Sequence, residues 1–122
     1  MYFNVRLTAN RASPAYGKRV YFEDVISNEG SGFDVGNSVF KAPVSGLYVF
    51  LATVCSEPKG LSETVSVTVM VNKVQRAFAS SSSMLTGSVS LVTKLSADSV
   101  VCLVSSGGIF RPTHTTFSGF LV

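Results

Sequence analysis

Residues 37–52 read Asn37-Ser-Val-Phe40-Lys-Ala-Pro43-Val-Ser-Gly46-Leu-Tyr48-Val-Phe-Leu-Ala52, and this stretch decides the fold. Pro43 has a fixed φ and no N–H, so a strand that begins before it should stop there. Gly46 follows three residues later and suits a tight reversal of the chain. The stretch therefore predicts a short strand, a turn and a longer apolar strand.

The longer strand, residues 47–54, is apolar on both faces. One face carries Tyr48, Phe50, Ala52 and Val54, and the other carries Leu47, Val49 and Leu51. Strands of this kind are central and covered on both sides. We expect the even-numbered face to lie in the core of the domain, so the odd-numbered face needs a second covering layer.

The composition is poor in charge for a free-standing domain. Of 122 residues, 46% are hydrophobic and only 14% are charged, whereas about a quarter is typical. Either the exposed surface is small, or apolar area is buried against further copies of the chain. The length predicts one domain over residues 1–122.

The net charge of +3 comes from ten Lys and Arg residues that are scattered singly, apart from Lys18-Arg19. This pattern argues against a nucleic-acid interface, which clusters basic residues on one face. No apolar run approaches the roughly 18 residues of a membrane span, and these residues begin with no signal peptide.

Alternating apolar residues outside the central stretch predict further short strands, and no segment has a helical period over more than a turn or two. They cover residues 2–8, 19–27, 63–71, 74–79, 86–95, 100–104 and 115–122. Turn-forming residues separate them, for example Asn72-Lys73. Eight to ten short strands predict an all-β sandwich or jelly roll.

The sequence offers no constellation for catalysis, so we expect no enzyme. His114 is the only histidine, and no Gly-X-Ser-X-Gly elbow occurs. No cofactor is expected. Calcium is possible through Asp34, although one carboxylate falls short of a hard-cation site. We expect Cys55 and Cys102 to be reduced thiols in different sheets rather than a disulfide.

A known family pattern runs through the whole chain. Its blocks are Phe3-X-Val-X-Leu7, Gly32-Phe-Asp34, Phe40-X-X-Pro-X-X-Gly-X-Tyr-X-Phe50 and the terminal Phe117-Ser-Gly-Phe-Leu121. The pattern resembles the globular head domain of complement component 1q, in the tumour-necrosis-factor-like superfamily. It is most similar to the short, stalkless members found in bivalves and other invertebrates.

The resemblance implies a ten-stranded jelly-roll β-sandwich that assembles as a tight homotrimer. The odd-numbered face of the central strand would then meet neighbouring subunits, with the terminal strand beside it in the same sheet. The interface residues implied are Leu47, Val49, Leu51, Phe117, Gly119 and Leu121.

The resemblance also implies a secreted, non-enzymatic recognition protein. Our first hypothesis is an innate-immune pattern-recognition lectin for microbial polysaccharide, lipopolysaccharide or sialylated glycans. The alternatives are a cytokine-like or synapse-organiser-like ligand of a protein receptor, and a structural or matrix trimerisation module. Loops at residues 56–62, 80–83 and 107–114 are the candidate recognition sites, with Lys59, Phe110, Arg111 and His114 as candidate ligand-binding residues.

Overall fold

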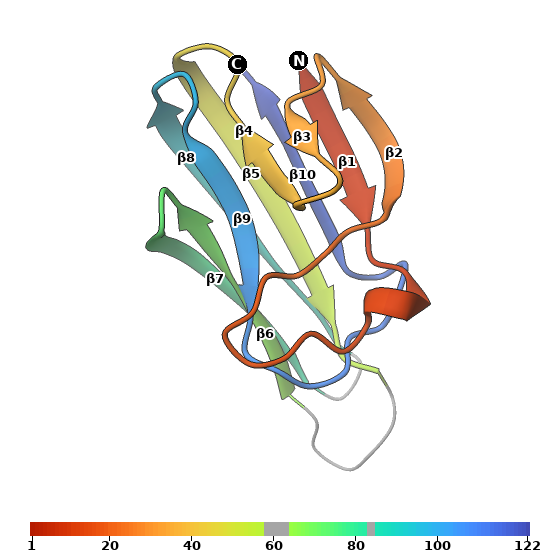
Figure 1. Cartoon of the computed structure of the whole chain (residues 1–122). Helices are drawn as coiled ribbons and strands as arrows, with labels where there is room; N and C mark the ends of the chain where they lie inside the picture. Colours follow the sequence, from red (N-terminus) through yellow and green to blue (C-terminus); the bar gives the residue numbers. More distant parts are fainter. Residues whose placement is uncertain (58–63, 83–84) are drawn as a thin grey trace.

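The computed structural model describes residues 1–57, 64–82 and 85–122 (Figure 1). Strands dominate these ranges, with one short 3-10 turn, η1 (Ala9–Arg11). The strands are β1 (Tyr2–Arg6), β2 (Asp24–Glu29), β3 (Phe33–Asp34), β4 (Val39–Lys41), β5 (Gly46–Cys55), β6 (Thr64–Val71), β7 (Val74–Ser82), β8 (Thr86–Leu95), β9 (Val100–Ser105) and β10 (Thr116–Leu121). The all-β prediction is confirmed.

Two five-stranded antiparallel sheets pack face to face. The first sheet has the strand order β2-β1-β10-β5-β8, and the second has the order β3-β4-β9-β6-β7. Figure 1 shows β4 and β9 in front of β5 and β10, with both ends of the chain at the same end of the sandwich. The chain passes repeatedly from one sheet to the other, as a jelly roll requires.

The core between the sheets is built on packed aromatic rings. The ring centroid of Phe3 lies 5.1 Å from those of Phe33 and Phe40 and 5.0 Å from that of Phe117. The even-numbered residues 48–54 of β5 are all buried in this core. The prediction for the inner face of the central strand is therefore confirmed.

The segment after Pro43 reverses the chain differently from the prediction. β4 belongs to the second sheet and β5 to the first, so the two strands are not partners in a hairpin. Gly46 does not have a left-handed backbone, and a Cβ there would lie 2.7 Å from Leu121 Cδ1, the movable end of a side chain. The segment is a crossing between the two sheets.

The predicted turn at Asn72-Lys73 is confirmed and joins β6 to β7. Both residues have left-handed backbones, with φ of 48° for Asn72 and 68° for Lys73. The Asn72 side chain also ties this hairpin to β9, since its Oδ1 accepts a hydrogen bond from the N–H of Val100 at 2.8 Å. Asn72 therefore adopts the left-handed backbone of the turn and also provides a hydrogen-bond acceptor for β9.

Replacing Asn72 with alanine should destabilise the protein by about 1–3 kcal/mol. Alanine tolerates a left-handed backbone poorly, and the Val100 N–H would lose its acceptor. Lys73→Asn is the matched control, because asparagine suits the φ of 68° at that position. Urea unfolding of the two variants checks this, and equal midpoints would contradict it.

Candidate functional site

The outward face of the first sheet carries a continuous row of apolar side chains. Tyr2 of β1 pairs with Phe120 of β10, Phe120 pairs with Val49 of β5, and Val49 pairs with Val92 of β8. Tyr2 is 50% exposed, Phe120 42% and Val92 61%. Leu47, Leu51 and Val122 flank the row, and we call these seven residues the assembly face.

The next cross-strand rows of the same face are polar. Asn4, Ser118 and Ser90 surround Leu51, and Arg6, Thr116 and Ser88 surround Thr53. On β1, β10, β5 and β8 the exposed apolar area is therefore confined to one end, while Val25 and Ile26 of the edge strand β2 are exposed separately. A contiguous apolar patch bounded by polar residues is typical of a protein–protein contact.

Three predicted interface residues of the terminal strand lie on the opposite face. Phe117 is fully buried and pairs with Ala52, and Leu121 pairs with Tyr48 and packs partly against the core. Gly119 pairs with Phe50, and a Cβ there would lie 2.7 Å from ring atoms of Phe3 and Phe50. The prediction for Phe117, Gly119 and Leu121 is wrong, because side chains alternate and Phe120 is the residue that faces outward.

The structure places the odd-numbered residues of β5 as predicted. Leu47 and Leu51 are exposed, and Val49 is half-buried among its outward neighbours. They are thus available for contact with another subunit. Their role in a trimer remains a prediction.

The predicted recognition loop at residues 107–114 is only partly exposed. Phe110 is wholly buried, and its N–H donates to the carbonyl oxygen of Ala12 at 2.8 Å. It is a core anchor, so its prediction as a ligand-binding residue is wrong. In the same loop, Arg111 is half-buried and His114 is exposed.

The other two predicted recognition loops contribute no described ligand-binding residue. Lys59, like most of the segment at residues 56–62, lies outside the described residues. Ser80 and Ser82 belong to β7 rather than to a loop, and Ser81 between them is buried. The prediction of a polar loop at residues 80–83 is therefore wrong for its described part.

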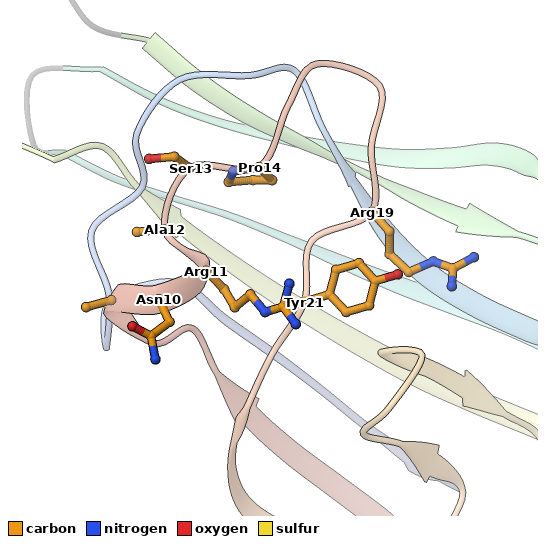
Figure 2. Close-up of a pocket in the computed structure, with 8 residues that line it drawn as sticks. Asn10, Arg11, Ala12, Ser13, Pro14, Arg19 and Tyr21 are labelled. Carbon is orange, nitrogen blue, oxygen red and sulfur yellow. The ribbon is translucent and has the colours of Figure 1, made fainter.

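A hollow of about 210 Å³ lies between η1 and Tyr21 (Figure 2). The guanidinium of Arg11 lies 5.0 Å from the centroid of the Tyr21 ring, and its Nε donates to Glu23 Oε2 at 3.2 Å. Hydrogen bonds from Thr8 and then Arg11 lower the pKa of the Glu23 carboxyl. The charge of Arg11 is already balanced by Glu23, so among the described residues Arg19 is the unpaired cation in the lining of this hollow.

Two adjoining cavities form a groove on the outward face of the second sheet. The first, about 460 Å³, has Arg19, Lys73, Val100 and Cys102 in its lining. The second, about 430 Å³, lies between Tyr16 and Phe78, and both share Gly17, Met70 and Val104. We call their combined surface the outer groove. Sequence reasoning missed it.

Cys102 lies on the floor of the outer groove, while Cys55 is buried in the first sheet. The predicted placement of the two cysteines in different sheets is confirmed. Burial raises the pKa of the Cys102 thiol, and the nearby Arg19 guanidinium opposes that shift. The thiol is therefore mostly protonated at neutral pH.

No cluster of three or more His, Cys, Asp or Glu side chains suits a metal ion within residues 1–57, 64–82 and 85–122. Asp34, the residue considered for calcium, accepts hydrogen bonds from Nδ2 and the backbone N–H of Asn37 at 2.8 and 3.2 Å. These bonds lower the pKa of Asp34. Its carboxylate closes a local turn.

The two-sheet jelly roll is of the tumour-necrosis-factor-like class. Residues 2–122 match the family described as "C1q domain", and the chain belongs to that family. The globular domain of zebrafish complement 1qA protein has a TM-score of 0.80 at 20% identity, over 99% of this chain and 96% of that chain. The crystal structure of murine APRIL at pH 5.0 has a TM-score of 0.74 at 11% identity, over the full length of both chains.

These comparisons confirm the resemblance to the globular C1q domain, while the similarity to short, stalkless invertebrate members stays a prediction. At such identities the two solved structures establish the shared fold. C1q domains trimerise and act as ligand-recognition modules, and the proteins that carry them are typically extracellular. The described part of this chain contains no helix with the length and hydropathy of a membrane span.

Proposed function

We propose that this chain forms a secreted homotrimer and acts as a non-enzymatic recognition protein for glycans on microbial or other anionic surfaces. The observation that carries the proposal is the assembly face, an apolar row across four strands on the outside of a folded subunit. Two further copies of the chain are the occupants that the C1q domain family favours.

Assembly through the first sheet would leave the outward face of the second sheet and the exposed part of the loop at residues 107–114 free on each subunit. A trimer would then present three identical recognition surfaces on one rigid body. Multivalent binding to a repetitive surface can exceed the affinity of one site by about 10²–10⁴. The proposal thus requires only weak binding at each site, which suits shallow surface grooves.

Charge supports an anionic ligand. Each chain has a net charge of +3, and a trimer carries three times that value. Arg19, Lys73 and Arg111 form no salt bridge with any described residue, while Arg6, Arg11 and Lys41 each pair with a carboxylate. A positive surface of this kind attracts anionic polysaccharide or lipopolysaccharide over several ångströms.

Binding to an array of bacterial polysaccharides, lipopolysaccharide and sialylated glycans tests this function. We expect the wild-type protein to bind acidic glycans, and the Val49→Asp variant, designed to be monomeric, to bind them at least about a hundredfold more weakly. The array should be run with and without calcium to settle whether the ion takes part. Failure to bind any glycan, together with saturable capture by one cell-surface protein, would favour the receptor-ligand alternative.

A further inference from the structure

The outer groove crosses three strands in one register. Phe78 of β7 pairs with Thr68 of β6, Thr68 pairs with Val104 of β9, and Val104 forms an isolated bridge with Arg19. Three strand spacings place Phe78 and Arg19 roughly 14 Å apart across the face. Figure 1 shows the connection between η1 and β2 passing in front of β9. This connection carries Arg19, which forms the bridge with Val104 of β9 and lines the groove.

One end of the groove is aromatic. Phe78 is 60% exposed and Tyr16 is 80% exposed. Thr68, Gln75 and Ser106 lie in the lining between them and provide hydrogen-bonding groups. A flat apolar ring beside hydroxyl and amide groups matches the face of a sugar ring, which presents C–H groups framed by hydroxyls.

The other end is cationic. Arg19 and Lys73 line the cavity over Met70, Val100, Cys102 and Val104, and no described carboxylate lines either cavity. Arg19 donates from Nη1 to the backbone carbonyl oxygen of Asn37 at 2.9 Å, while its buried Nε has no acceptor. Figure 2 shows the Arg19 side chain directed away from Arg11. The positive charge at this end is therefore unbalanced.

We propose that the outer groove is the glycan site of this protein and takes a short acidic oligosaccharide. One sugar ring packs on Phe78, and a carboxylate or sulfate of a later ring lies against Arg19 and Lys73. The separation of the two ends suits a linear chain of several sugars better than a single one. This inference rests on the proposed function, and it places recognition on a sheet face rather than on the loop that carries Arg111 and His114.

The test compares two charge-matched double variants of the trimer. Arg19→Gln with Lys73→Asn removes two cations from the groove, and Lys73→Asn suits the left-handed turn. Arg11→Gln with Lys41→Gln removes two cations outside the groove, so the net charge of the two double variants falls equally. We expect the groove variant to bind an alginate trisaccharide about tenfold more weakly and the control variant to change less than twofold.

Cys102 supplies a second readout at the site itself. Because Cys55 is buried, native alkylation at pH 8.5 should modify Cys102 first, giving one maleimide adduct per chain. A bound alginate trisaccharide should slow that reaction, while the neutral sugar maltotriose should not. The Phe78→Ala variant should lose this protection and keep its fold, because Phe78 is exposed.

The outcomes separate the two proposals. Weaker binding by the groove variant, with protection of Cys102, supports the outer groove as the site. If the wild-type protein binds the trisaccharide but Cys102 stays unprotected and the groove variant binds as well as the control, the site is elsewhere and glycan recognition survives. If the wild-type protein binds no acidic glycan on the array, both proposals fail together.

Discussion

Val49→Asp is expected to give a folded monomer. Val49 lies at the centre of the apolar row, paired with Phe120 on one side and Val92 on the other. In the proposed trimer the substitution would place three carboxylates in an apolar contact with no cation opposite. An unpaired buried charge costs about 3–5 kcal/mol, so assembly should need roughly a hundredfold higher concentration or more.

Two variants control this experiment. Phe50→Asp changes the adjacent residue of the same strand but faces the core, so it should unfold the subunit. Phe78→Asp introduces the same charge on the outward face of the second sheet and should leave the trimer intact. Sedimentation velocity and circular dichroism read out assembly and fold separately. A trimeric Val49→Asp protein would show that the assembly face is misplaced.

Phe3→Ala should cost about 3–5 kcal/mol of stability, the typical range for removing a buried phenylalanine ring. The reason is its central place in the core, where its ring packs against Phe33, Phe40, Phe50 and Phe117. Its position in β1 also bridges the two sheets, because Phe33 and Phe40 belong to the second sheet. The cavity left by the ring would therefore loosen the contact between the layers.

The matched control for Phe3 is Phe78→Ala, which removes the same ring from an exposed position. We expect that variant to change the free energy of unfolding by less than about 0.5 kcal/mol. Chemical denaturation at one fixed protein concentration is required, since assembly makes stability depend on concentration. Similar losses for the two variants would contradict the central role given to Phe3.

Much of the fold was predictable because it is encoded locally. The two-residue alternation of residues 47–54 and the Asn72-Lys73 turn each depend on neighbours in the chain. The terminal strand was harder, because its apolar residues Phe117, Phe120 and Leu121 follow neither parity. Its inward face is decided by Gly119, which must lie against Phe3 and Phe50 from other strands.

The site was less predictable for a related reason. Phe110 follows two glycines in a polar segment and suggests an exposed loop, yet the loop folds back onto the backbone of Ala12. The outer groove combines the segment around Arg19 with β6, β7 and β9, and only the pairing of those strands brings its residues together. No local pattern in the sequence marks it.

The mass of the wild-type protein in solution tests the central claim most directly. Light scattering on chromatographically separated protein at micromolar concentration should give three times the chain mass of 12.9 kDa. The value should persist at high salt, because an apolar contact is not screened. A mass of one chain under these conditions would contradict the account, since the assembly face would then be uncovered and recognition could not be multivalent.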